Sequence, residues 1–311
     1  MLREDRRIEA WDPAGNSDIR RNQQIQQLGM PLTRKTSLKC SPYALACGFV
    51  WACPVKARVV DNVGGDTTEH LCFVTGCRAR MEPSTSSTVR SGGIKVLLSL
   101  GGDRGLQSLN STEDAHQVAE YIYRNFLGGT PSPPSRRPFG KAVLDGVNFS
   151  VAGKTPMDRM HWEDLAKALA GYSTARRKVY LVAAPQCTYP DPTLRKALNT
   201  GLFDIVWIRF YNNTSCQYSE VRPWALMGSW LQWNSNLHVG GIFLGLPASR
   251  ELVGNGYVPP VNFMAEILPY ISNFPRFWGV MLWDRYQDKR SKYSYWIRSA
   301  VMEPQAAKSS I

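Results

Sequence analysis

Long apolar segments are absent from this chain of 311 residues. No stretch approaches the roughly 18 consecutive apolar residues that a membrane-spanning helix needs, which excludes a helical membrane protein. The opening sequence MLREDRRIEAW is charged where a secretion signal would be apolar, so it shows no signal peptide. Charged residues make up only 20% of the chain and apolar residues 43%, which excludes a disordered chain and predicts a soluble globular protein.

Metal-binding patterns are also lacking. The four histidines are scattered with no HExxH motif, and no two of the seven cysteines have CxxC spacing. Neither a zinc site nor a thioredoxin-like motif is supported, and we expect no metal and no cofactor. Five of the cysteines fall in the first quarter of the chain, and the odd total leaves at least one free thiol in a monomer.

Acidic residues are fewer than basic ones, 25 against 37, which gives a net charge of +12. Such a balance favours polyanionic partners such as nucleic acid or acidic glycans. The basic residues form only short groups, at 34–35, 136–137 and 176–178, and none is interleaved with aromatic residues on a nucleic-acid module. We therefore interpret the charge as a solvated basic surface and expect no nucleic-acid partner.

From about residue 92 onward, short apolar runs rich in β-branched residues alternate with segments of helical period. Successive runs start about 26 to 48 residues apart, which suits one crossover helix for each strand. The pattern predicts strands at 94–100, 142–151, 179–184, 205–211, 241–246 and 279–283. It predicts a helix capped at 111–114 that ends after 126, and further helices at about 156–172, 192–201, 224–233, 261–274 and 293–302.

Six strands with intervening helices are three quarters of a (β/α)8 barrel. We therefore predict a single-domain α/β protein, a TIM barrel with an irregular or incomplete N-terminal portion. Of the two strands still needed, 43–51 is a fair candidate, whereas 7–11 is short and charged. The predicted division is an irregular segment at 1–39, a barrel at 40–302 and a tail at 303–311.

Two strand ends carry a motif. The first strand of the series ends in SLGG at 99–102, and the second reads LDGVNFSVA at 144–152. Here the sequence resembles the plant class III chitinases of glycoside hydrolase family 18, whose third strand carries SxGG and whose fourth carries DGxDxDxE. The likeness continues in register from about residue 92 to 302, for example through TGLFDIVWIRFYNN at 200–213 and GVMLWDRYQDK at 279–289.

The acidic motif of that family is mostly missing. Its four positions fall on Asp145, Asn148, Ser150 and Ala152, so only the first acid is retained. In the family mechanism the N-acetyl oxygen of the substrate attacks, and the Glu of the motif is the general acid, a contribution worth roughly 100- to 10,000-fold. Ala152 has no proton to give, and Ser150 supplies no anion beside the developing positive charge. The resemblance thus implies that hydrolysis is abolished.

The residues that bind sugar in the family are better retained. Tyr211 falls on the tyrosine that bonds the acetamide, and Trp283 falls on the tryptophan that forms the floor of the central sugar site. Arg209 replaces the usual glutamine, and it either fills the cleft or pairs with Asp145. The implied substrate-binding set is Tyr211, Trp283, Asp145, Arg209, Gly101 and Gly102.

The resemblance also implies disulfides. Cys187 and Cys216 fall where the family places one bridge, and Cys72 and Cys77 match a second, shorter loop. Such bridges imply an extracellular or vacuolar protein, as is usual for the family, although no signal peptide is visible.

The expected function is that of a catalytically inactive, monomeric chitinase-like protein that binds chitin or a related glycan, or a glycanase such as a microbial xylanase. One alternative is an active endochitinase with a displaced acid, for which Asp158, Glu163, Asp164 and Asp284 are the candidates. The other is a xylanase inhibitor. The segments at 209–211 and 283–286 resemble the inhibitor branch, whereas 256–260 resembles the chitinases, so no target enzyme is assigned.

Overall fold

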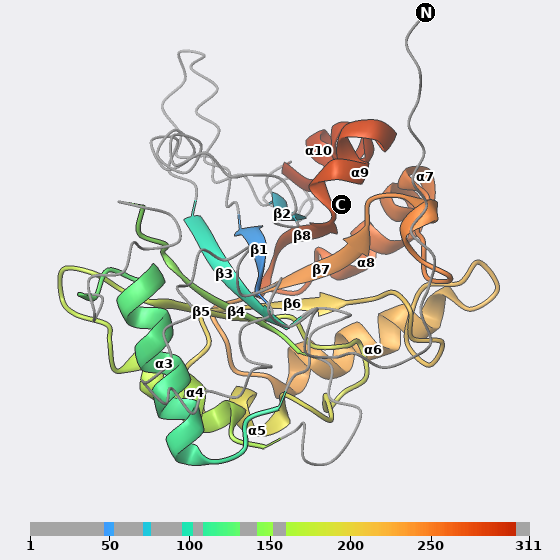
Figure 1. Ribbon diagram of the computed structural model, residues 1–311. Coiled ribbons are helices and arrows are strands. Elements are labelled where there is room, and N and C mark those ends of the chain that lie inside the picture. Colours follow the sequence, from blue (N-terminus) through green and yellow to red (C-terminus); the bar gives the residue numbers. More distant parts are fainter. Residues whose placement is uncertain are drawn as a thin grey trace, which may run out of the picture.

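The computed structural model of the chain describes residues 47–52, 71–75, 95–101, 108–130, 142–151 and 160–302. These residues form a closed barrel of eight strands in the order β1-β2-β8-β7-β6-β5-β4-β3, with helices on its outside (Figure 1). The predicted α/β barrel is confirmed. Several predictions lie outside the described residues: the segment 1–39, the strand 7–11, the tail 303–311, Gly102, Ala152, Asp158 and Cys77.

The six strands predicted from residue 92 onward are all present, with ends shifted by a few residues. Parallel pairing joins each of them to the next around the barrel. Strands that are covered on both faces are apolar throughout, which explains why they were readily predicted. They are β3 (Lys95–Gly101), β4 (Gly146–Ser150), β5 (Tyr180–Ala183), β6 (Ile205–Arg209), β7 (Gly241–Pro247) and β8 (Phe277–Trp283).

The other two strands differ from the prediction. β1 (Cys47–Ala52) overlaps the strand expected at 43–51, but it pairs antiparallel with both β2 and β3, so the ring is not wholly parallel. β2 (Leu71–Thr75) was not predicted and pairs in parallel with β8, where the barrel hypothesis needed the strand at 7–11.

The helices follow the predicted series with two short additions, at 250–252 and 285–291. Ser111 caps the first of them, because its side chain accepts a hydrogen bond from the Asp114 amide at 3.0 Å. The short helix α9 (Arg285–Ser291) was not predicted. The others are α3 (Thr112–Phe126), α4 (Trp162–Ala170), α5 (Arg195–Leu198), α6 (Pro223–Asn236), η2 (Arg250–Leu252), the continuous set α7 (Pro260–Asn262), η3 (Phe263–Ile267) and α8 (Leu268–Ile271), and α10 (Tyr293–Met302).

The barrel interior is filled with side chains. A buried cluster of apolar residues occupies it, and Trp283 packs against this cluster from the carboxyl end of β8. A filled interior leaves the carboxyl ends of the strands as the place for a site. The cluster is Leu97, Val182, Ile205, Trp207, Phe243 and Met281. Among the described helices, none has the length and apolar character to cross a membrane.

Candidate functional site

β3 and β4 end side by side. Gly101 on β3 pairs with Ser150 on β4. The φ angle of Gly101 is +91°, and a Cβ atom there would lie 2.5 Å from the Ser150 carbonyl oxygen. Side chains other than hydrogen are therefore excluded at this position, and close backbone packing accounts for the glycine.

Asn148 lies deeper in the barrel, where it is 1% exposed. Its Nδ2 donates a hydrogen bond to Ser99 Oγ on β3 at 2.9 Å. Its Oδ1 is buried and has no hydrogen-bond partner in the described part of the chain. The position that the sequence resemblance aligns with an acid thus holds a neutral amide, which is hydrogen-bonded to a neighbouring strand.

Asp145 lies at the other end of the barrel. It precedes β4, and its carboxylate accepts a hydrogen bond from the amide of Val96, near the start of β3, at 2.8 Å. Five residues separate it from Ser150, which is about 16 Å along a strand. The structure therefore does not bring Asp145 together with Arg209, Tyr211 or Trp283. The motif at 145–152 runs along the whole of β4, so Asp145 and Ser150 lie at opposite ends of the strand.

Arg209 is the last residue of β6 and is 7% exposed. Its Nη2 donates to the carbonyl of Val151, just after β4, at 3.4 Å. Its Nε has no partner within the described residues. Because a guanidinium is charged at every ordinary pH, a positive charge is held beside the end of β4, one residue before Ala152.

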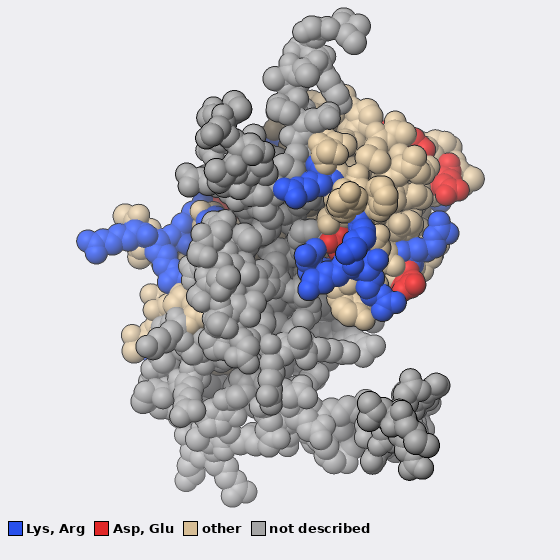
Figure 2. Space-filling view, turned by 90° about the horizontal axis from the view of Figure 1, so that it is seen from above, with Lys and Arg blue, Asp and Glu red and all other residues tan. Residues whose placement is uncertain are grey.

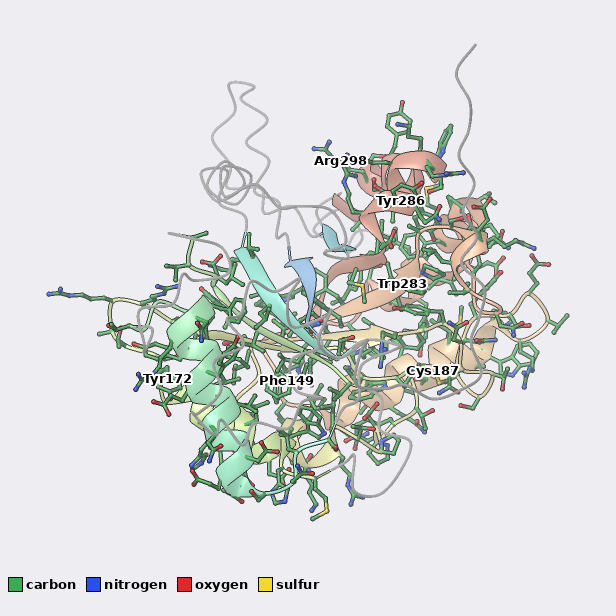
Figure 3. All side chains as sticks on the ribbon, in the orientation of Figure 1. Phe149, Tyr172, Cys187, Trp283, Tyr286 and Arg298 are labelled. Carbon is green, nitrogen blue, oxygen red and sulfur yellow. A yellow bond between two sulfur atoms is a disulfide. The ribbon has the colours of Figure 1, made fainter. Side chains whose placement is uncertain are left out.

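Tyr211 and Trp283 come together. Their rings stack with centroids 5.4 Å apart and planes 7° from parallel. Tyr211 is 7% exposed, whereas Trp283 is only half-buried at the end of β8 (Figure 3). Tyr211 thus supports the Trp283 ring, and Trp283 is the more exposed of the two. The peptide bond from Trp283 to Asp284 is cis.

Sequence reasoning missed Gln186, which follows β5. It forms a β-bridge with Arg209, and its Oε1 is buried without a partner among the described residues. With Asn148 Oδ1 and Arg209 Nε, three neighbouring strands each contribute one unpartnered polar atom. The position of Gln186 next to Cys187, at a predicted strand end, was the available signal.

Cys187 and Cys216 form a disulfide with an S–S distance of 2.03 Å, the pairing that the resemblance implied. The bridge joins the segments that follow β5 and β6. The carbonyl of Cys187 also accepts hydrogen bonds from Ser229 Oγ and Trp233 Nε1 on α6. The second implied pairing, Cys72 with Cys77, involves side chains outside the described residues.

The structure places three of the four alternative acids, Glu163, Asp164 and Asp284. Glu163 and Asp164 are on α4, outside the barrel. His161 and Thr112 donate to Asp164, and chiefly the hydrogen bond from His161 holds the pKa of this carboxyl below its ordinary value. Asp284 lies after β8, but its Oδ1 caps α9 by accepting from the Gln287 amide at 3.0 Å. The described residues contain no group of three His, Cys, Asp or Glu side chains arranged to hold a metal ion.

Comparisons with known proteins agree with this barrel. No family model matches the chain. An acidic endochitinase of Vitis vinifera is 49% identical over 256 residues, which cover 79% of this chain and 83% of the relative.

Solved structures of two kinds are similar. A chitinase of Ipomoea carnea is 37% identical with a TM-score of 0.65, and the match covers 74% of this chain and 85% of that one. A xylanase and α-amylase inhibitor of Scadoxus multiflorus is 36% identical with a TM-score of 0.66, over 75% and 84% of the two chains. The barrel, the disulfide and these relatives together show that the chain belongs to the plant endochitinases of glycoside hydrolase family 18.

Proposed function

We propose that this chain is a catalytically inactive member of its family that binds chitin or another N-acetylglucosamine-containing glycan at the carboxyl ends of its strands. The observation that carries the proposal is the placement of Arg209. Its guanidinium bonds to Val151 at the end of β4, beside the segment where the family has its acids.

The charge at this place is opposite to the one that the reaction needs. Positive charge develops on the sugar and its acetamide in the family mechanism, and carboxylates stabilise it. Asn148 and Ser150 are neutral, and Ala152 carries no acid. Two positive unit charges about 5 Å apart repel by about 3 kcal/mol at an effective dielectric constant of 20. The barrel therefore lacks the proton donor and also disfavours the charged intermediate.

Binding does not need those acids. The partly exposed ring of Trp283, supported by Tyr211, offers an aromatic face for the apolar face of a sugar. The unpartnered atoms of Asn148, Gln186 and Arg209 supply hydrogen-bonding capacity on three adjacent strands. A ring with a few polar groups around it is the usual composition of a small-ligand site.

The proposal is tested with a fluorogenic chitotrioside and with calorimetry on chitin oligomers. We expect no turnover above background and measurable binding, which Trp283→Ala abolishes and Trp283→Phe weakens less. Trp224→Ala, which removes a tryptophan that is 63% exposed on α6, is the matched control and keeps wild-type binding. Turnover above background that is lost in Trp283→Ala overturns the inactive assignment, and absence of oligomer binding overturns the glycan assignment.

A second candidate is a glycanase inhibitor. It is supported by the likeness to the Scadoxus xylanase and α-amylase inhibitor and by the segment at 283–286. Dose-dependent inhibition of a fungal xylanase by the purified chain supports this candidate, and full xylanase activity at a large molar excess of the chain rejects it.

The Cys187–Cys216 disulfide supports an extracellular or vacuolar location, because such bridges persist in oxidising compartments.

A further inference from the structure

The last helix of the barrel presents aromatic side chains to solvent. α10 buries Tyr293, Ile297 and Val301, spaced four residues apart on one face. On its other side Tyr295 is 73% exposed and Trp296 is 58% exposed. The rings of these two residues meet edge to face, with centroids 5.5 Å apart. The packing of α10 therefore does not depend on either exposed ring.

α10 and the helix before it, α9, carry an excess of exposed basic side chains. Residues 284–302 contain five basic and two acidic residues, and all five basic side chains are exposed. The acids are used internally: Asp288 is 2% exposed and binds Arg285 and Ser294, and Asp284 caps α9. Figure 2, which looks down on the top of Figure 1, shows more Lys and Arg than Asp and Glu among the coloured side chains.

One ring and one cation on α9 are held together. Arg290 Nη1 donates to the Tyr286 hydroxyl at 3.3 Å, and its guanidinium lies 5.8 Å from the ring centroid. Tyr286 remains 62% exposed. The bond to Tyr286, and to a smaller extent the carboxylate of Glu251 on η2, raise the pKa of Arg290 above its ordinary value. Tyr286 and Arg298 project from α9 and α10 at the top of Figure 3.

We infer that Tyr286, Arg290, Tyr295, Trp296 and Arg298, here called the α9–α10 surface, bind an acidic polysaccharide, a linear polymer of uronic acids. Each uronate offers an apolar ring face, which stacks on an aromatic side chain, and a carboxylate, which pairs with a guanidinium. The chain has a net charge of +12, which draws such a polyanion to it. This surface shares no residue with the site proposed for chitin at the carboxyl ends of the strands, here called the barrel mouth. The inference therefore stands whether or not the chain binds chitin.

A uronate polymer fits this surface better than a single-stranded nucleic acid. Successive bases stack on aromatic platforms, whereas the rings of Tyr295 and Trp296 are 81° from parallel.

The test is binding to polygalacturonate, measured by affinity electrophoresis at increasing salt. We expect retardation of the wild type that weakens as salt rises, because exposed charges are screened. The double variant Arg290→Glu, Arg298→Glu should bind about tenfold or more weakly and lose most of the salt dependence. Tyr295→Ala, Trp296→Ala should also bind about tenfold more weakly but keep its salt dependence.

Matched controls use exposed residues elsewhere. Arg195→Glu on α5 and Trp224→Ala on α6 should bind polygalacturonate as the wild type does. Fully methyl-esterified polygalacturonate, which keeps the sugar but not the charge, should bind weakly. Unchanged affinity in both double variants overturns the inference, and so does equal binding of polyadenylate. Chitin-oligomer binding measured on the same variants should be unchanged, which separates this result from the test of the barrel mouth.

Discussion

At the scale of single residues, the mouth of the barrel holds the buried positive charge of Arg209. By the sequence resemblance, Arg209 falls where the family usually has glutamine, and its guanidinium donates a hydrogen bond to the carbonyl of Val151. A buried guanidinium is costly without an anion, and Nε has no partner in the described chain. This cost favours a role of Arg209 in binding over a role in stability.

Restoring the missing acid alone should not restore hydrolysis. In Ala152→Glu the general acid returns, but Asn148 and Ser150 still supply no negative charge and Arg209 still supplies a positive one. We expect chitotrioside turnover to stay at background in this single variant. The combined variant Asn148→Asp, Ser150→Asp, Ala152→Glu, Arg209→Gln should gain measurable turnover. Recovery in Ala152→Glu by itself would show that the other three positions matter little.

The candidate site could be predicted only in part at this scale. The likeness of 205–213 and 279–289 to the family located Tyr211 and Trp283, because aromatic residues at strand ends keep their place when the barrel does. That Asp145 lies at the far end of the barrel and that Tyr211 is buried behind Trp283 depend on strand direction and side-chain packing. A motif does not contain that information.

At the scale of elements, a hydrogen-bonded group joins the starts of two outer helices. Asp164 on α4 accepts from Thr112 Oγ1 at the start of α3 at 2.8 Å and bonds to His161 Nδ1 at 3.0 Å. These bonds favour the ionised carboxylate, so the pKa of Asp164 lies below its ordinary value of 3.8. The link between α3 and α4 therefore depends on pH.

Stability should reflect this link in acid. A carboxyl whose pKa is lower in the folded state than in the unfolded state adds stability above the unfolded value, and this stability is lost as pH falls through the folded value. Asp164→Asn should thus be less stable than the wild type at pH 7, and the difference should shrink below about pH 4. Urea unfolding at several pH values measures it. Glu120→Gln, which removes an exposed pair with Arg124, should show little difference at any pH. A gap between Asp164→Asn and the wild type that does not narrow at all as the pH falls below 4 would contradict the link.

Elements were predicted well where their apolar pattern was long. β6 and β7 are buried along their whole length, so their sequences are continuous apolar runs. α9 was missed because its seven residues, RYQDKRS, contain almost no apolar side chain and bury only Asp288. The antiparallel direction of β1 was missed because apolar pattern does not encode direction.

At the scale of the whole molecule, we predict a monomer. Among the described residues, the exposed large apolar side chains are spread over several elements, for example Trp224 on α6, Trp278 on β8 and the neighbours Tyr295 and Trp296 on α10. Stable self-association usually needs one contiguous patch. Sedimentation equilibrium should therefore give a single species of 34.9 kDa at micromolar concentration. A mass that doubles with concentration would show that a shared surface exists.

Cys187 gives the molecule two attachments of different chemical kinds. Its sulfur is bridged to Cys216, and its carbonyl oxygen is bound by Ser229 and Trp233 from α6. Reductants cleave only the first attachment, because the second uses the peptide backbone. A reducing environment should thus remove the covalent link between the segments that follow β5 and β6, while α6 stays hydrogen-bonded to the Cys187 carbonyl.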